Sequence, residues 1–422
     1  KGNRMREAWK QSRQLKKNCL DFFSLKRNQM TKFSVLLPTR NRLEYLKFAI
    51  NSVLQQDYEN WEIVVSDNCS DQDIEGYITS LADQRIKYYR TETFIPVTDN
   101  WNMALEKSDG DYVIMLGDDD ALMQGYFRTL LNLLKDFDSP DLVYSSALLY
   151  AYPGVVPGFP QGLLHKWGNA EFLEGKTRPF LLDKAQAVDT VQRSLQFKVL
   201  FNFNMQFALV SRCLIQECQK QGSFYQSPFP DYYAMTVLMF KAKKILAVPD
   251  PLVVVGITSK SFGYYFFNEK EQVGVEFLKN YPNESLIKNI KQYLMPGLHM
   301  NTSWLIALEA VKRNFGQEFN LEVNYKKYRI LQMLHYFKNY ACEKNMSLRD
   351  IWNMKKFLFW WEKLFYFFPC LICSQVLRWY PKKQQRDDYI YNFVTSFSHP
   401  SFTMERIQKD YNDISEIIRN HS

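Results

Sequence analysis

The clearest candidates for chemistry are three adjacent carboxylates, Asp118, Asp119 and Asp120. They follow Gly117 and an apolar run. Neighbouring carboxylates repel one another, so such a run favours a bound cation or full solvation. Mg²⁺ binds proteins through one or two carboxylates plus phosphate oxygens, so the run suits a divalent metal ion that holds a diphosphate. The alternative is that these side chains, Asp120 in particular, only interact with the N-terminus of the next helix.

Two further polar clusters follow apolar runs, PTRNR at 38–42 and DNCSD at 67–71. In the second cluster, Asp67 could accept a hydrogen bond from a pyrimidine or a ribose. In the first, the polar groups and the next helix N-terminus suit contact with a nucleotide or phosphate. For both clusters the alternative is that a side chain only caps the following helix.

A fourth candidate is Asp231, in the segment SPFPDYYAM at a predicted helix start. A carboxylate there could act as the general base for a hydroxyl nucleophile. Capping of a helix over 232–244 explains the pattern equally well. No GxGxxG or GxxxxGK[ST] sequence accompanies the first cluster, which disfavours dinucleotide-binding and P-loop proteins.

The elements that must position these residues alternate between strand and helix. Apolar runs predict strands at 33–39, 61–66, 85–90, 111–116 and 141–150, and helical spacing predicts helices at 43–54, 74–82, 99–107 and 122–136. This alternation predicts an α/β fold with a doubly wound, mainly parallel sheet flanked by helices. Ligands bind such sheets beyond the carboxyl ends of the strands, where the polar clusters lie.

Beyond residue 150 the pattern is less regular. The segment 151–180 is predicted to be an irregular connection, and 256–270 a mobile aromatic segment. Further helices are predicted at 184–196, 212–220 and 232–244, and further strands at 205–211 and 245–255. From about residue 275 helical spacing dominates, so we expect a mostly helical C-terminal region.

The net charge of +8 lies entirely in the first 32 residues, which hold ten Lys and Arg against two acidic residues. The other 390 residues are balanced at 43 to 43, so we expect a folded body that does not bind nucleic acid. The basic arm itself could contact anionic lipid or nucleic acid. Seven scattered cysteines and the lack of a visible secretory signal predict reduced thiols in the cytoplasm.

The segment 357–380 (FLFWWEKLFYFFPCLICSQVLRWY) is rich in aromatic residues. Its uninterrupted apolar part, 364–373, has ten residues, too few to cross about 30 Å of hydrocarbon. Lysines and arginines flank it, so a helix lying in the membrane interface is one prediction. A core helix of the C-terminal region, kinked at Pro369, is the other.

The run FSVLLPTRNRLEYLKFAINSVLQQDYENWEIVVSDNCSDQD and its continuation WNMALEKSDGDYVIMLGDDDAL resemble family 2 glycosyltransferases, which have a GT-A fold. The resemblance covers about residues 31–256. Four elements stand in the family's order and spacing: VLLPTRNR, VVSDNCSD, GDYVIMLGDDD and Asp231 in PDYY. Many members have an Asp where Gly117 stands, so GDDD departs from the usual DxDD.

The resemblance implies a donor site and a catalytic base. The residues expected to bind the nucleotide are Pro38, Thr39, Arg40, Asp67, Asn68, Asn100 and Asp118. Asp67 would contact the base, most often uracil in this family, and Asn100 with Asn102 would approach the donor phosphates. The expected ligands of Mg²⁺ or Mn²⁺ are Asp119, Asp118 and Asp120, with Asp119 foremost, and Asp231 would be the general base.

We therefore expect an inverting, metal-dependent glycosyltransferase that uses a nucleotide-sugar donor, a UDP-sugar, in surface polysaccharide or glycolipid synthesis. The metal would neutralise the diphosphate leaving group, and a carboxylate would help to deprotonate the acceptor. The expected acceptor is a saccharide or lipid-linked saccharide, met through peripheral contact with the inner face of the membrane. The alternatives are a non-catalytic nucleotide-sugar-binding scaffold and a GT-A-like nucleotidyltransferase.

These expectations divide the chain into three parts. Residues 1–30 form a basic N-terminal arm. Residues 31–256 form the GT-A catalytic domain, and residues 257–422 form a mostly helical, aromatic-rich C-terminal region.

Overall fold

The computed structural model describes most of the chain from residue 30 onward. The described residues are 30–156, 161–167, 170–198, 203–261, 264, 284–296, 300–342, 346–379, 383, 385, 387, 404–406, 411 and 413–420. Residues 1–29 of the predicted basic arm, and most of the predicted aromatic segment 256–270, therefore lie outside the described residues.

The first half of the sheet is parallel and follows the predicted alternation. Its strands are β1 (Phe33–Thr39), β2 (Trp61–Asp67), β3 (Ile86–Arg90) and β4 (Tyr112–Met115), in the spatial order β3-β2-β1-β4. The connecting helices are α2 (Leu43–Leu54), α3 (Ile74–Ser80) and α4 (Val97–Glu106). Strands β1, β2 and β4 are almost fully buried, as their continuous apolar sequences predict.

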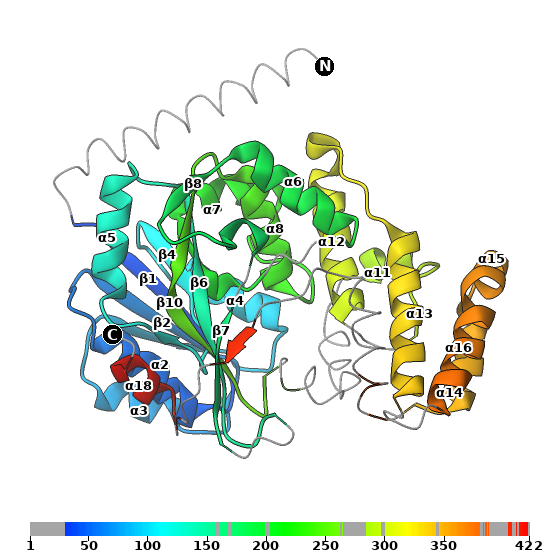
Figure 1. The fold of residues 1–422 in the computed structure, drawn as a ribbon. Coiled ribbons are helices and arrows are strands. Elements are labelled where there is room, and N and C mark those ends of the chain that lie inside the picture. The colour runs from blue at the N-terminus through cyan, green and yellow to red at the C-terminus, as the bar shows by residue number, and fades with distance from the viewer. Residues whose placement is uncertain are drawn as a thin grey trace, which may run out of the picture.

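The second half of the sheet is mixed. Strand β9 (Ala208–Ser211) lies antiparallel between β4 and β6 (Leu142–Ala151), and β6 pairs in parallel with the long β10 (Ile245–Ile257). Short antiparallel strands complete it: β5 (Ala121–Leu122), β7 (Leu163–Trp167) and β8 (Phe180–Leu182). Parallel pairing still covers more residue positions than antiparallel pairing. The predicted α/β class with a sheet flanked by helices is confirmed (Figure 1).

Three short strands between residues 120 and 185 were not predicted. Strand β5 occupies the expected start of the helix over 122–136, which begins only at Tyr126 as α5 (Tyr126–Asp136). Strands β7 and β8 lie in the segment 151–180, which was expected to be irregular. These strands have two to five residues, too few to show an apolar alternation, and they exist because longer strands pair with them.

The helices of the second half are α6 (Lys184–Leu195), α7 (Arg212–Cys218) and α8 (Pro230–Lys241). Helix α8 is buried on almost every side because α6, α7 and α12 all pack against it. Short 3₁₀ turns occur at Glu171–Leu173, Met205–Phe207, Gln219–Gln221 and Lys355–Phe357.

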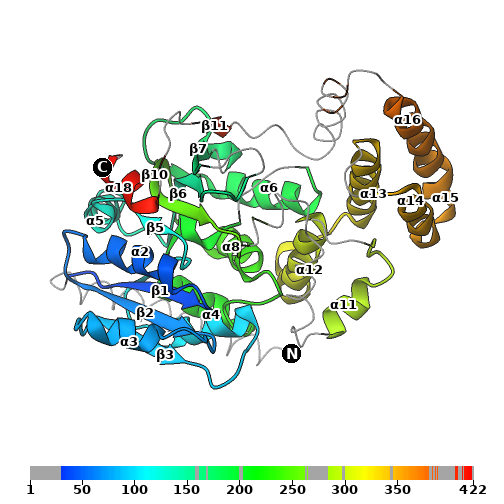
Figure 2. The same cartoon turned by 90° about the horizontal axis from the view of Figure 1, so that it is seen from below.

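The C-terminal region is helical, as predicted. Its helices are α11 (Glu284–Ile290), α12 (Met300–Phe319), α13 (Tyr325–Ala341), α14 (Leu348–Met354), α15 (Trp360–Glu362) and α16 (Phe368–Arg378), with a π-helical turn at Lys363–Phe367. Helix α12 packs on α8, α13 packs on α12, and α14 and α16 pack on α13, so α14–α16 form the outermost layer (Figure 2). In the described part of the chain, no helix combines the length and apolar character needed to cross a bilayer.

The last described elements return to the sheet. Strand β11 (Met404–Arg406) pairs antiparallel with β7, and α18 (Ile414–Asn420) packs against α2 and β5 (Figure 2). The hydroxyl of Tyr150 donates a hydrogen bond of 2.8 Å to the carbonyl of Tyr411. The predicted boundary near residue 256 stays a prediction, but residues 404–420 add to the sheet rather than to the helical layer.

Candidate functional site

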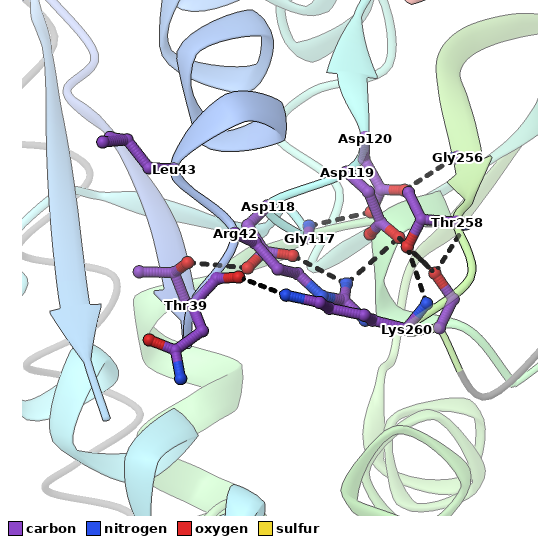
Figure 3. A network of polar contacts seen from close by, with 12 residues as sticks. Thr39, Arg42, Leu43, Gly117, Asp118, Asp119, Asp120, Gly256, Thr258 and Lys260 are labelled. Carbon is purple, nitrogen blue, oxygen red and sulfur yellow. Dashed lines mark hydrogen bonds and ion pairs between the residues drawn. The ribbon is translucent and has the colours of Figure 1, made fainter. Parts of the chain in front are cut away.

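The polar clusters predicted from the sequence meet at one edge of the sheet. Thr39, the last residue of β1, is paired with Asp67, the last residue of β2. The hydroxyl of Thr39 donates a 2.6 Å hydrogen bond to Oδ2 of Asp118, which follows β4 (Figure 3). The carboxyl ends of three parallel strands therefore bring these side chains to one place, as expected for a sheet of this kind.

Arg42 lies between two of the carboxylates. Its Nη1 donates to Oδ1 of Asp118 at 2.9 Å and to Oδ2 of Asp119 at 3.1 Å (Figure 3). Burial alone would lower the pKa of Arg42, but the two carboxylates outweigh it and raise the pKa. Burial raises the pKa of Asp118, and the guanidinium opposes this shift. Arg42 thus acts as a resident counter-ion for a buried acidic pair.

A further polar segment, directly after β10, completes this network. The hydroxyl of Thr258 donates to Oδ2 of Asp119 at 3.3 Å, and the hydroxyl of Ser261 donates to the same oxygen. The ammonium of Lys260 donates to the carbonyl of Asn41 at 2.7 Å. These residues were not predicted from the sequence, although TSKS follows a buried strand just as the other polar clusters do.

Asp120 has a different role from its two neighbours. Its Oδ2 accepts the N–H of Gly117 and its Oδ1 accepts the N–H of Gly256, both at 2.8 Å. Burial, followed by the nearby Asp119, raises its pKa well above the usual range. Because both oxygens are held by the main chain, the contacts do not support the prediction that Asp120 binds a metal. The alternative at a helix N-terminus also fails, since α5 begins only at Tyr126.

Gly256 allows this close packing of β10 against the acidic turn. A Cβ at Gly256 would overlap the carbonyl oxygen of Asp119. Its N–H is also the donor that fixes Asp120. The acidic turn is therefore tied to β10 by contacts that require a glycine at this position.

Three of the predicted nucleotide-binding residues hold the loops around the site. Asp67 is fully buried, where Oδ1 accepts the N–H of Ser70 at 3.0 Å and Oδ2 accepts the hydroxyl of Tyr88 at 2.7 Å. Asn68 bonds the carbonyl and the N–H of Ile95, and Asn100 bonds Ser66 through both ends of its amide. These contacts do not support direct donor contacts by Asn68 and Asn100, and the role of Asp67 stays a prediction.

Arg40 and Phe94 form an exposed flat surface beside these loops. Pro38 is part of β1 and partly exposed. Arg40 donates to the carbonyl of Asn68 at 3.0 Å, and its guanidinium lies 4.2 Å from the ring centre of Phe94, which is 49% exposed. Guanidinium planes and aromatic rings both stack on nucleobases. Phe94 could not be found from the sequence, because only the fold shows that this aromatic side chain is left exposed.

Asp231 lies at the N-terminal end of α8. The helix begins at Pro230, so Asp231 is inside its first turn, and the capping alternative is wrong because Phe229 occupies the N-cap. Oδ1 of Asp231 accepts the N–H of Tyr232 at 2.9 Å. The side chain is only partly exposed, and desolvation raises its pKa to about 7.

The loop before Asp231 is held by α4. The amide of Asn102 donates to the carbonyl of Tyr225 at 2.9 Å and accepts the N–H of the same residue at 3.1 Å. The hydroxyl of Thr98 donates to the carbonyl of Ser227 at 2.6 Å. Asn102, which was expected near the donor phosphates, and Thr98 thus position the segment that leads to Asp231.

The acidic pair suits a metal ion only in part. Among the described residues, no group of three or more His, Cys, Asp or Glu could hold a metal, so the predicted three-carboxylate set is not assembled. A divalent cation that takes one or two carboxylates and shares its coordination with a diphosphate needs only Asp118 and Asp119. Arg42 shows that a positive charge already fits between them. The donor set therefore fits a cation that binds together with a diphosphate.

Residues 34–163 match the family model described as glycosyl transferase family 2, which confirms the resemblance recognised in the sequence for this part of the chain. A GalNAc(5)-diNAcBac-PP-undecaprenol beta-1,3-glucosyltransferase of Campylobacter jejuni is 38% identical over 105 residues, which cover 24% of this chain and 34% of that protein. The colanic acid biosynthesis protein WcaA of Escherichia coli, described as a glycosyl transferase, is 29% identical over 30% of this chain and 48% of its own length.

A third relative is the Escherichia coli UDP-Glc:alpha-D-GlcNAc-diphosphoundecaprenol beta-1,3-glucosyltransferase WfgD. It is 31% identical over 24% of this chain and 40% of its own length. The chain thus matches between a third and a half of the length of these three relatives.

Solved structures with a similar course include S. aureus TarS 1–349 in complex with UDP-GlcNAc, with a TM-score of 0.40 and 15% identity over 86% of this chain and 90% of that chain. The mannosyltransferase PcManGT of Pyrobaculum calidifontis, in complex with GDP-Man and Mn²⁺, has a TM-score of 0.38 and 13% identity over 88% of this chain and 86% of that chain. The fold assignment rests on strand order and pairing in this chain.

Proposed function

We propose that this chain, whose residues 34–163 match glycosyl transferase family 2, transfers a sugar from a nucleotide-diphosphate donor to an acceptor hydroxyl. The observation on which the proposal mainly rests is the acidic pair Asp118 and Asp119, neutralised by Arg42, where the ends of β1, β4 and β10 meet. At this site the Arg42 guanidinium can be exchanged for another cation, and a charged diphosphate can then bind. We propose a UDP-sugar as the donor.

The surroundings of the acidic pair suit the parts of such a donor. The exposed surface of Arg40 and Phe94 offers a stacking platform for the base. The hydroxyls of Thr258 and Ser261 contact Asp119, and the ammonium of Lys260 lies at the carbonyl of Asn41, so all three can donate to phosphate oxygens beside the pair. The site thus offers a stacking surface for the base and hydrogen-bond donors for the phosphates.

The acidic pair is the proposed binding site for a divalent cation. Asp119, assisted by Asp118, would hold Mg²⁺ or Mn²⁺, which would neutralise the charge on the departing diphosphate. Arg42 would then be free to move from the carboxylates to a phosphate, since a guanidinium binds phosphate with two parallel hydrogen bonds. Asp120 would keep the acidic turn in place during this exchange, because its bonds go only to Gly117 and Gly256.

Asp231 is the proposed general base. Its pKa of about 7 means that the carboxylate is about half ionised near pH 7, is mostly ionised above it and can still accept a proton readily. It would take the proton of the acceptor hydroxyl as that oxygen attacks the anomeric carbon opposite the diphosphate. Such an in-line displacement inverts the configuration of the sugar.

A saccharide linked to a polyprenyl diphosphate is the acceptor that the relatives favour. Two of them are named as glucosyltransferases whose acceptors are linked to undecaprenol through a diphosphate. Four cysteines of the described part of the chain, Cys69, Cys218, Cys370 and Cys373, are free thiols, which supports a reducing compartment such as the cytoplasm.

The test is transfer from a panel of UDP-sugars and GDP-mannose to a polyprenyl-diphosphate-linked N-acetylglucosamine, with Mn²⁺ present. We expect one donor to give product of inverted anomeric configuration by NMR, and Asp119→Asn and Asp231→Asn to abolish it. Asp109→Asn is the matched control, since Asp109 is an exposed carboxylate away from the site. Product of retained configuration would contradict the inverting mechanism. Donor binding without any transfer would favour the scaffold, and nucleotide attached to a sugar phosphate would indicate a nucleotidyltransferase.

A further inference from the structure

An apolar surface is exposed on the outermost helices. In the part of the chain that the structure describes, fourteen large hydrophobic side chains are exposed, and ten of them lie between residues 352 and 379. We define the outer face of α15–α16 by six of them: Trp360, Leu364, Phe368, Ile372, Val376 and Trp379. Trp360 is 74% exposed and Trp379 is 85% exposed. Monomeric proteins rarely leave so large a contiguous apolar patch in water.

The outer face is built by helical spacing. The first five residues of the set recur every four positions, which places them along one side of the helix. The opposite side is buried, with Phe367 and Ser374 packed inward and α16 lying against α13. One side of the helix is therefore covered by the protein, and the apolar outer face is not. The prediction of a packed helix describes the covered side, and the interfacial helix stays a prediction for the outer face.

The π-helical turn at Lys363–Phe367 ends two residues before Pro369, where a kink was predicted. A proline cannot donate the main-chain hydrogen bond of a regular helix, and a π-turn is one way to absorb that loss. The segment consequently runs on from Trp360 to Arg378 in one helical course rather than folding back into the core.

The border of the outer face is positively charged. Between residues 351 and 379 the cations are Lys355, Lys356, Lys363 and Arg378, and the one acidic residue is Glu362. Glu362 is buried, and Nε and Nη2 of Arg329 each donate a 2.7 Å hydrogen bond to its carboxylate. The charge of Glu362 is therefore neutralised within the protein. Lys356 is exposed, and Lys355 lies above the rings of Trp352 and Phe368.

The outer face is accessible to a large flat surface. Helices α14–α16 form the layer farthest from the sheet, with α13 and α12 between them and α8 (Figure 2). The face therefore points away from the acidic pair and its network, which lie at the sheet.

We infer that the outer face of α15–α16 docks onto an anionic lipid surface. Exposed aromatic and aliphatic side chains bordered by lysines are typical of helices that lie in the membrane interface. The basic border complements anionic headgroups. A second copy of this chain fits less well, because a symmetric contact would bring two basic borders together. The inference goes beyond the proposed transfer reaction, since lipid binding needs neither donor nor acceptor.

The test is flotation of the full chain with vesicles of phosphatidylcholine, with and without about one third phosphatidylglycerol. We expect binding to the anionic vesicles that weakens as salt is added. Trp360→Ser with Trp379→Ser should weaken it roughly tenfold or more, because both side chains insert into the interface. Lys356→Gln should weaken it about fivefold, the effect of about 1 kcal/mol per surface cation. Leu181→Ser is the control, as Leu181 is exposed on β8 and should have no effect.

Three results would overturn the inference. The first is no flotation with anionic vesicles by a sample whose circular dichroism is native. The second is flotation that the double tryptophan variant leaves unchanged, which would assign lipid binding to another segment such as the basic arm. The third is concentration-dependent self-association, measured by sedimentation, that the double variant abolishes while vesicle binding stays absent. Nucleotide binding measured in the same samples without vesicles separates failure of this inference from failure of the proposed function.

Discussion

Replacing Asp231 by asparagine tests its proposed role through stability as well as activity. Desolvation raises the pKa of this carboxyl from the usual 3.8 to about 7. The folded state therefore keeps a proton that the unfolded state releases between about pH 4 and pH 7. The contribution of this carboxyl group to the free energy of unfolding is fully favourable below about pH 4 and is lost as the pH rises through about 7. Asparagine keeps the hydrogen bond from the N–H of Tyr232 without carrying the charge.

The size of the effect follows from the shift in pKa. About three units at about 1.4 kcal/mol each set an upper limit of roughly 4 kcal/mol at pH 8. Because the side chain is partly exposed, solvent screens the charge, and we expect about 2 kcal/mol. Asp231→Asn should therefore be more stable than the wild type by about 2 kcal/mol near pH 8 and equally stable near pH 4. The same variant should lose at least about 100-fold in transfer rate if Asp231 is the base.

The assay is urea unfolding followed by tryptophan fluorescence at both pH values. Asp250→Asn is the matched control, since Asp250 is an exposed carboxylate and its variant should unfold like the wild type at both. A variant at position 231 that is less stable than the wild type near pH 8 would refute the argument from desolvation. A stabilised variant with normal transfer activity would keep that argument and remove Asp231 from catalysis.

Three further predictions concern the packing around the site and the helical layer. Gly256→Ala should lower the free energy of unfolding, measured in urea, by more than about 2 kcal/mol, because a Cβ there overlaps main-chain atoms. Gly316→Ala within α12 is the control and should raise the free energy of unfolding by about 0.5 kcal/mol. Equal effects of the two variants would contradict this prediction. Arg42→Gln should cost about 3 kcal/mol because it leaves two buried carboxylates without a counter-ion, and Mn²⁺ should raise its melting temperature more than that of the wild type. A smaller Mn²⁺ effect on the variant would show that the cation does not replace the guanidinium. Arg329→Met should cost roughly 3–5 kcal/mol by leaving Glu362 buried and unpaired, and an unchanged urea midpoint would refute the pair's role.

The sequence predicted the parallel half of the sheet closely. Strand β1 and helix α2 have the predicted bounds, because a buried strand is a continuous apolar run and an amphipathic helix repeats at three and four positions. The same patterns did not predict that β5 is a strand, or that β9 lies between β4 and β6. A strand's neighbours and direction are decided by long-range pairing, which leaves no periodic mark in the strand itself.

The site was predicted in its location more than in its contacts. Polar residues after buried strands predicted that Thr39 and Asp118 would lie together, because parallel strands end at one edge of the sheet, and their roles in donor and metal binding stay predictions. The distinct role of Asp120 depends on Gly256, which lies 136 positions away in the sequence. Likewise, only the fold shows that Asn68 and Asn100 use their amides on the main chain around Ile95 and on Ser66.

The most direct test of the central claim is calorimetric binding of UDP, GDP, dTDP and CDP to the full chain, with and without Mn²⁺. It requires no knowledge of the sugar or the acceptor. We predict that UDP binds, that Mn²⁺ strengthens its binding, and that Asp119→Asn abolishes the effect of Mn²⁺ while Asp109→Asn does not. Failure of all four nucleotides to bind a folded sample, or equal Mn²⁺-dependent binding by the Asp119 variant, would contradict the proposed donor site.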